Sequence, residues 1–352
     1  MKKIALLVAI AVCSLGASAQ NVAKNEIKQI QAFLAQPAEE AATNAEALKV
    51  TDVKNIAGIE GITVENGHVT AIEWKGKKLA GSLDLSGFSA LKKVDVSRNR
   101  LTSVDMTNDA AVYDVNVSRN RLTSFTMTGC PQIVKLSVNN NRLTDISLGE
   151  LAFIQDLNVA GNYLVALDIT GSSTLKTLNC QSNHLESLSV ENCTALKSLY
   201  AGYNKLNTIT LSGLTSLESL NVDDNSIANM VVSNLPALSF YVCSDNNMQG
   251  LAVNNCPVIL DIVCSYNDLT TFTVSNCPQL QYVDCSYNDL TTLNLSNQTF
   301  LQRVICNNNQ LTSLNVSFDQ ALTYLNCRYN QIVDLNTQAC PNLKMVASEW
   351  NY

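Results

Sequence analysis

Apolar and polar residues alternate in short runs along most of the chain, and each run closes on an asparagine. The run from Val283 to Ser296, VDCSYNDLTTLNLS, has near copies 21 residues before it and 21 residues after it. Its asparagine recurs at a strict spacing of 21 residues, without insertion or deletion, which is typical of a structural repeat. The spaced asparagines are Asn99, Asn120, Asn141, Asn162, Asn183, Asn204, Asn225, Asn246, Asn267, Asn288, Asn309, Asn330 and Asn351.

Apolar residues occupy fixed places around each asparagine and predict where the strands lie. They stand eight, five and three residues before it and two residues after it, as Leu280, Val283, Cys285 and Leu290 do around Asn288. Alternation with a period of two turns one side of a short strand inward, and a second alternating pair further on predicts an extended segment on the back of each coil. One coil cannot bury its apolar side alone, so the coils must stack. We therefore expect a curved, β-rich repeat solenoid with one long parallel sheet, spanning roughly 60 Å.

The repeated asparagine is expected to be structural. An amide side chain both donates and accepts hydrogen bonds, and it stands where the chain turns out of the strand. A buried turn leaves backbone N–H and C=O groups that need partners. A ladder of asparagines up the stack can supply those partners on every coil.

Five cysteines share one inward position on consecutive coils and predict a ladder of thiols. They are Cys243, Cys264, Cys285, Cys306 and Cys327. Cysteine is small and among the most buried residue types, which favours a core-filling stack. The alternative is a set of disulfides, but parallel neighbouring strands aim the sulfurs poorly and five rungs cannot all pair. The sequence shows no Cys-x-x-Cys motif or Cys/His cluster, so we predict no metal and no other cofactor.

The first residues have the features of a secretory signal. Residues 1–19 carry Lys2 and Lys3, an apolar segment and a small-residue cleavage site before Gln20. Export to the periplasm, to the outer surface or into the medium is the prediction. Cys13 raises a lipoprotein alternative, which the large Val12 before it disfavours. No later run approaches the length of a membrane span.

Residues 20–61 differ from the repeats and predict a helical N-terminal cap. Ile27, Ile30 and Leu34 have helical spacing, and Pro37 is suited to the first turn of a second helix. Such a cap covers the apolar edge of the first coil. The repeat domain is expected over residues 62–352, as one irregular first repeat followed by about 13 repeats of 21 residues. It opens with a hairpin at Asn66-Gly67.

The repeat as a whole reads L-x-x-L-x-(V/C)-x-x-N-x-L, the leucine-rich-repeat signature. It resembles the 21-residue, cysteine-ladder repeats of internalin-J-like bacterial surface proteins, whose second half is similar to LTTLNLS at Leu290 and LTSLNVS at Leu311. The resemblance covers residues 70–352. It implies an exported protein that binds other macromolecules, often on host surfaces.

Candidate binding residues flank the asparagines, where the core leaves the residue type free. Near the N-terminal end they form a basic patch, which suits a carboxylate, sulfate or phosphate group on a partner because arginine binds such groups in a bidentate way. Further along they form an aromatic row with polar tips, as binding hot spots do. These residues are Arg98, Arg100, Arg119, Arg121, Arg142, Tyr203, Tyr266, Tyr287, Tyr329 and Trp350.

Other chemistries fit the sequence less well. The stacked aspartates Asp224, Asp245, Asp268 and Asp289 could hold Ca²⁺ but are few for a cage. His184 lacks an activated nucleophile beside it, and an open sheet excludes water badly, so we expect no enzyme. A net charge of −7, more acidic still without Lys2 and Lys3, disfavours general nucleic-acid binding.

The sequence thus predicts an exported, non-catalytic scaffold that binds a protein or a glycan through its exposed strand face. The alternative is a structural component of the cell envelope that self-associates through its C-terminal edge, because an open parallel edge invites pairing.

Overall fold

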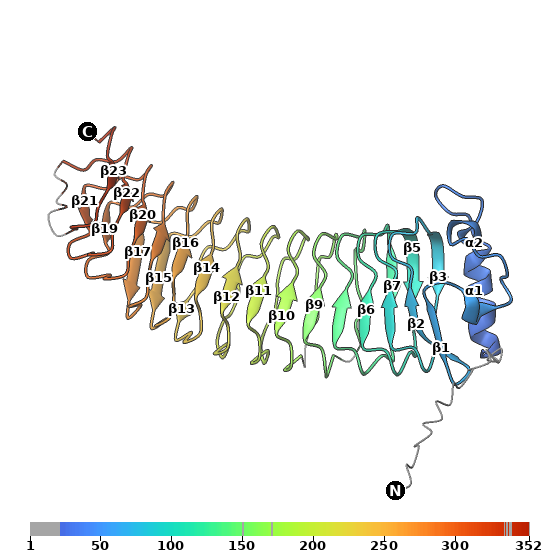
Figure 1. Ribbon diagram of the computed structural model, residues 1–352. Coiled ribbons are helices and arrows are strands. Elements are labelled where there is room, and N and C mark those ends of the chain that lie inside the picture. The colour runs from blue at the N-terminus through green and yellow to red at the C-terminus, as the bar shows by residue number, and fades with distance from the viewer. Residues whose placement is uncertain are drawn as a thin grey trace, which may run out of the picture.

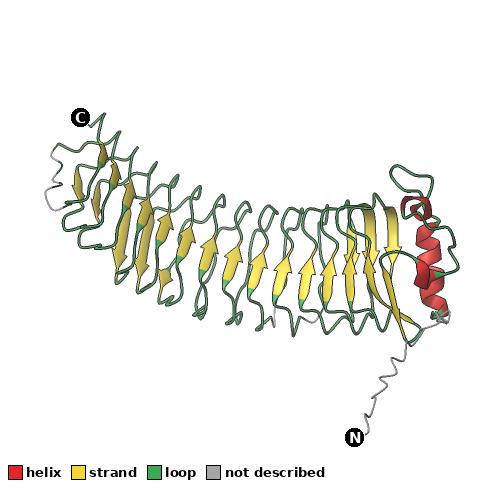
Figure 2. Ribbon diagram, in the orientation of Figure 1, coloured by secondary structure: helices red, strands yellow, loops and turns green. Residues whose placement is uncertain are grey.

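The computed structural model is a gently curved rod of stacked coils with two helices at its N-terminal end (Figures 1 and 2). It describes residues 22–149, 151–169, 172–333, 335, 337 and 340–351. The predicted solenoid and its helical cap are confirmed. The predicted signal segment, residues 1–19, lies outside the described residues.

One sheet of 15 strands runs the length of the rod. Its first two strands form the antiparallel hairpin predicted at Asn66-Gly67, where both residues have positive φ. The later strands pair in parallel and in register, as Leu178 does with Leu199. The strands are β1 (Ile62–Glu65), β2 (His68–Glu73), β4 (Lys93–Asp95), β6 (Asp114–Asn116), β8 (Lys135–Ser137), β9 (Asp156–Asn158), β10 (Thr177–Asn179), β11 (Ser198–Tyr200), β12 (Ser219–Asn221), β14 (Phe240–Val242), β16 (Asp261–Val263), β18 (Tyr282–Asp284), β20 (Arg303–Ile305), β22 (Tyr324–Asn326) and β23 (Met345–Ala347).

The extended segments predicted on the back of the coils pair into three small sheets. The first sheet has a register shift between Gly81 and Ser82, inside the stretch where the first repeat carries an extra residue. Between β7 and β13 the described back segments make only an isolated bridge, Thr126 to Ser147, and no named strand. The back strands are β3 (Ala80–Asp84), β5 (Arg100–Asp105) and β7 (Ser124–Thr126), then β13 (Val232–Ser233), β15 (Gly250–Asn254) and β17 (Thr271–Ser275), then β19 (Thr292–Asn294) and β21 (Ser313–Asn315).

Each asparagine of the ladder ties its own coil to the preceding one. Asn183 Nδ2 donates to the backbone oxygens of Cys180 in its own coil and of Val159 in the coil before, both at 3.1 Å. Its Oδ1 accepts from the Leu164 backbone N–H at 3.1 Å. The same three bonds recur at Asn246 and Asn288, among others. The side chain therefore pairs backbone groups that the turn leaves without partners.

The five thiols of the ladder lie in the core. Cys243, Cys264, Cys285, Cys306 and Cys327 have no exposed surface. All eleven cysteines in the described part of the chain are buried and unpaired. On other coils Val159, Ala201 and Val222 fill the same buried column, so the thiol packs there as a small apolar group.

The cap is bound to the first coil by buried polar and aromatic contacts. It consists of α1 (Lys24–Leu34), α2 (Asn44–Ala47) and the 3-10 turn Ile56–Gly58. Glu26, which is 1% exposed, accepts from the Val69 N–H at 2.8 Å. Phe33 stacks on Trp74 with 5.7 Å between ring centroids. These contacts cover the apolar edge that an isolated first coil would expose.

The predicted start of the second helix at Pro37 is wrong. The helix begins at Asn44, because Thr43 caps it by accepting from the Glu46 N–H at 3.2 Å. The residues before this helix are hydrogen-bonded to the first repeat instead: the Glu39 N–H donates to the Lys78 backbone oxygen at 3.2 Å.

We predict that Asn183→Ala lowers the free energy of unfolding by about 3 kcal/mol, since it strips one N–H and two C=O groups of their partners in a buried turn. Asn179→Ala is the matched control: its amide accepts only a local bond from Gln181 N–H and is partly buried. Urea unfolding monitored by circular dichroism measures both. Equal losses in the two variants would contradict the proposed role of the ladder.

We also predict that the ladder thiols do not react with a water-soluble aromatic disulfide at pH 8 in the folded chain. Burial removes access to them, and it raises the pKa of Cys243 to about 12 and that of Cys327 to about 11. Absorbance of the released thiolate should appear only after urea is added. Rapid labelling of the native protein would show that this column is open to solvent.

Candidate functional site

The residue before each ladder asparagine has a left-handed backbone, with φ between 49° and 65° on all thirteen coils. This conformation takes the chain out of the strand, so these residues lie in the turns along one edge of the rod. The prediction that candidate residues such as Arg98 and Tyr266 lie on the exposed strand face is therefore wrong. The edge formed by the residues just before and just after each ladder asparagine is called the turn edge below.

The left-handed backbone conformation at these positions disfavours most residues that carry a side chain. A left-handed conformation costs a residue with a Cβ atom about 1–2 kcal/mol relative to its usual state, and glycine escapes that cost. Only three of these thirteen residues are glycine or asparagine, namely Asn140, Gly161 and Asn308; the others include arginine, aspartate, tyrosine and tryptophan. The opposite turn of the coils has left-handed residues too, and these are almost all asparagine or glycine: Asn108, Gly129, Asn192, Gly213, Asn234, Asn255, Asn276, Asn297 and Phe318. The chemistry of the turn edge is therefore not explained by backbone geometry.

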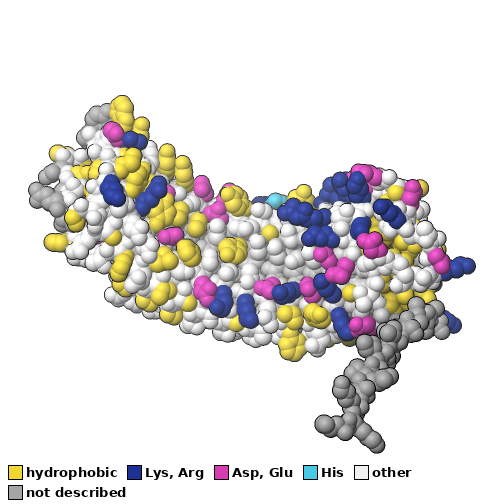
Figure 3. Space-filling view, in the orientation of Figure 1, with side chains coloured by type: hydrophobic (Ala, Val, Ile, Leu, Met, Phe, Trp, Pro, Cys, Tyr) yellow, Lys and Arg dark blue, Asp and Glu magenta, His cyan; other side chains and the backbone are white. Residues whose placement is uncertain are grey.

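The predicted basic residues meet in one shallow hollow of about 530 Å³ near the cap. It is lined by five arginines, by ladder asparagines and by Tyr163. Figure 3 shows Lys and Arg side chains gathered on this edge toward the capped end. The lining arginines are Arg98, Arg100, Arg119, Arg121 and Arg142.

The predicted aromatic residues stack on one another near the other end of the turn edge. The rings of Tyr266 and Tyr287 lie 4.3 Å apart at an interplanar angle of 8°. Those of Tyr329 and Trp350 lie 6.0 Å apart at 1°. About half of each side chain stays exposed, between 43% and 56%. Tyr203 is exposed as well, but it lies on the turn edge three coils before Tyr266 and outside the stacks.

Aspartates separate the basic and aromatic parts of the turn edge. Burial raises the pKa of Asp245, and the neighbouring Asp224 adds to the effect. Burial is also the main cause that raises the pKa of Asp223. Within the described residues no group of three or more His, Cys, Asp or Glu side chains is placed to hold a metal ion. The edge thus changes from basic to acidic to aromatic along the rod.

A second exposed row, which the sequence analysis missed, lies on the strand face beside the aromatic stacks. The Arg303 guanidinium lies over two rings, 4.5 Å from the Tyr324 centroid and 5.8 Å from that of Tyr282. Phe240 and Met345 are 44% and 52% exposed on the same face. The signal was present in the sequence, because all five residues stand six positions before a ladder asparagine.

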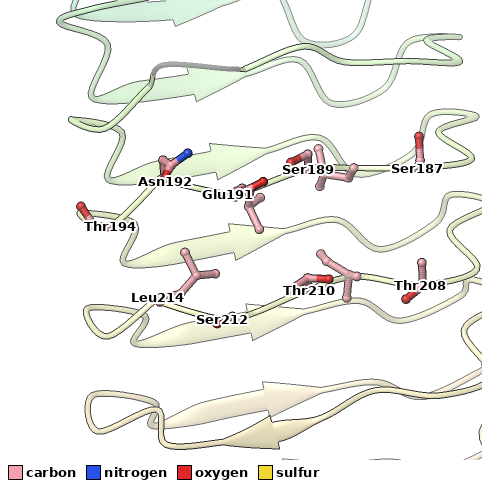
Figure 4. A pocket seen from close by; sticks show the side chains of 13 residues that line it. Ser187, Ser189, Glu191, Asn192, Thr194, Thr208, Thr210, Ser212 and Leu214 are labelled. Atoms are coloured by element: carbon pink, nitrogen blue, oxygen red, sulfur yellow. The ribbon is translucent and has the colours of Figure 1, made fainter.

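The back of the rod has a hollow of about 420 Å³ between two coils that do not pair as strands (Figure 4). Serine and threonine hydroxyls line it, among them Ser187, Ser189 and Thr208. Glu191 is the one titratable side chain among its lining residues. This set offers hydrogen bonds but no acid–base pair.

Two carboxyl groups are buried in the turns opposite the candidate site. Asp109 and Asp319 have no exposed surface, and each has one oxygen that accepts a backbone N–H while the other has no partner. Desolvation raises the pKa of Asp109 to about 8 and that of Asp319 to about 7. Their burial keeps them from any substrate, so they bear on stability.

Comparison with known proteins identifies the fold. No protein-family model and no curated protein matches the chain. Among solved structures, the functional domain of InlJ from Listeria monocytogenes, which includes a cysteine ladder, matches with a TM-score of 0.51 and 22% identity over 75% of this chain and 68% of that one. A leucine-rich-repeat protein of Leptospira interrogans matches with a TM-score of 0.53 and 19% identity over 77% of this chain and 91% of that one.

A third similar structure is the leucine-rich-repeat ectodomain of the plant membrane receptor kinase GASSHO1/SCHENGEN3 from Arabidopsis thaliana, in complex with CASPARIAN STRIP INTEGRITY FACTOR 2. It has a TM-score of 0.62 and 20% identity over 92% of this chain, which spans 47% of that one. These likenesses show that the chain has the leucine-rich-repeat fold and that its cysteine ladder has a counterpart in a solved structure. No helix in the described residues is long and apolar enough to cross a membrane.

We predict that Asp109→Asn gains stability over the native chain as the pH rises from 5 to 9. The folded pKa lies near 8 and the unfolded one near 3.9, so the carboxyl group favours the folded state fully below about pH 3.9 and loses that contribution as the pH approaches 8. Asparagine keeps the acceptor for the Phe88 N–H and does not ionise. Melting temperatures at several pH values measure the effect, and a constant difference would contradict the raised pKa.

Proposed function

We propose that this chain is an exported, non-catalytic scaffold that binds a protein or glycan partner through its turn edge. The proposal rests mainly on the residue types found at the left-handed turn before each ladder asparagine. Ten of its thirteen residues are neither glycine nor asparagine, whereas the left-handed residues of the opposite turn, within the described part of the chain, are asparagine or glycine with the exception of Phe318. Surface chemistry that persists against a local backbone cost is typical of functional sites.

The two ends of the edge offer complementary means of recognition. Stacked, half-exposed tyrosines present flat apolar bodies with polar tips, which suits a protein hot spot or the face of a sugar ring. The arginine hollow offers paired donors to an anion. The adjacent strand face with Phe240, Tyr324 and Met345 widens the aromatic region.

Two further considerations support the proposal. A plant receptor ectodomain of the same fold is in complex with a partner, so the fold can serve recognition outside a cell. Residues 1–19 have the features of a secretory signal, which would deliver the chain to the periplasm, the outer surface or the medium.

We predict that Tyr266→Ala with Tyr287→Ala weakens partner binding at least about tenfold without lowering the melting temperature, because exposed hot-spot rings contribute to binding more than to folding. The partner is captured from mucosal and bacterial envelope extracts, identified, purified and titrated by calorimetry. The matched control is Tyr113→Ala with Phe300→Ala, two exposed rings outside the turn edge. Unchanged affinity in the Tyr266/Tyr287 variant would contradict the assignment of this surface.

Solution scattering of the purified chain distinguishes the binding scaffold from the alternative, a self-associating envelope component. A mass that stays monomeric as the concentration rises would count against it. Concentration-dependent oligomers without any captured partner would favour it over the scaffold.

A further inference from the structure

We propose that the arginine hollow beside the cap binds a linear acidic glycan, through carboxylate or sulfate groups spaced along its chain. The inference rests on the proposed function and names the ligand class for one part of the turn edge.

The hollow holds far more positive than negative charge. Three of its arginines, Arg98, Arg119 and Arg142, have no acidic partner among the described residues. The side chains of Arg98, Arg119 and Arg142 are exposed, while the ladder asparagines fix the backbone beneath them. Like charges on neighbouring coils repel, so their stacking is unfavourable until an anion lies between them.

The cap supplies a built-in example of the ligand chemistry. Glu39 reaches the hollow from the N-terminal cap, with 2.6 Å between its Oε2 and Arg100 Nε and 3.6 Å between its Oε1 and Arg121 Nη2. Its side chain is 26% exposed. One carboxylate is thus held by arginines of two successive coils, and the remaining arginines can hold further anionic groups in the same way.

The shape of the charged region favours a linear polymer over a single small anion. The residues that follow the ladder asparagines form a row along the turn edge. After the arginines this row continues with Tyr163 and His184, whose rings lie 5.9 Å apart, and then with Lys205. Successive coils are about 4.8 Å apart, so a chain with regular charges can contact several coils at once. Beyond this track Asp224 and Asp245 make the edge acidic, which limits the length of the bound segment.

Two other polyanions fit less well. An extended acidic peptide carries same-side groups about 6.7 Å apart, which fall out of step with coils 4.8 Å apart. Apart from Tyr163, arginine and asparagine line the hollow, so it offers a protein partner fewer apolar contacts than the tyrosine stack further along the turn edge. A nucleic acid extending past the track would meet Asp224 and Asp245 on a chain of net charge −7.

The test titrates the full chain with polygalacturonate and with dextran sulfate, which separate carboxylate from sulfate recognition. Neutral dextran, poly-glutamate and a single-stranded oligonucleotide are the comparison probes. Arg98→Ala with Arg119→Ala should weaken binding of the acidic glycan about tenfold or more, while Lys54→Ala with Lys344→Ala, which removes the same charge elsewhere, should leave it nearly unchanged. Arg119→Lys should also weaken binding, because lysine keeps the charge but loses the planar pair of donors.

Glu39→Gln is expected to change the affinity in the opposite direction to the arginine substitutions. Misfolding would not explain such a gain in affinity. It releases Arg100 and Arg121 and should tighten binding about threefold, with the effect fading at high salt. Equal effects of the arginine and lysine pairs, no tightening by Glu39→Gln, or tighter binding of poly-glutamate or the oligonucleotide would overturn the proposal. If no acidic glycan binds while the captured partner still depends on Tyr266 and Tyr287, this inference fails and the scaffold function stands.

Discussion

The amide of the ladder asparagine is the constraint on which the rest of the molecule depends. It bonds a C=O of its own coil, a C=O of the preceding coil and an N–H of that coil, as Asn183 does with Cys180, Val159 and Leu164. No other uncharged side chain of that size both donates two protons and accepts one in a plane. The bonds hold the chain in a tight turn after each strand, and the left-handed residue before the asparagine follows from that turn.

The repeat made the fold predictable, because stacking requires the same alternation on every coil and leaves the same signal thirteen times. The cap was less predictable. Pro37 can start a helix, but Thr43 offers its hydroxyl to the Glu46 N–H, and the intervening residues contact the first repeat through Lys78. That choice depends on a tertiary surface, which a pattern of residue types does not contain.

The candidate site was predictable in its residues but not in its position. Recurrence beside the asparagines singled out Arg98 and Tyr266, yet only backbone dihedrals reveal that the chain has already left the strand there. The row containing Phe240 and Arg303 was overlooked because polar residues interrupt it, so no run of aromatic residues appears in the sequence. The role of Glu39 could not be inferred either, since the cap lies outside the repeat and its docking sets the contact.

The in-register pairing of the coils affects how such a surface can evolve. Because each coil bonds only to its neighbours, a genetic exchange that inserts or removes one whole 21-residue unit, as between Leu178 and Leu199, leaves each rung with a matching partner. The separation between the arginine hollow and the tyrosine stack would then grow or shrink by one step of the stack. Unequal recombination can therefore change the distance between two binding surfaces on the rod while the fold stays the same.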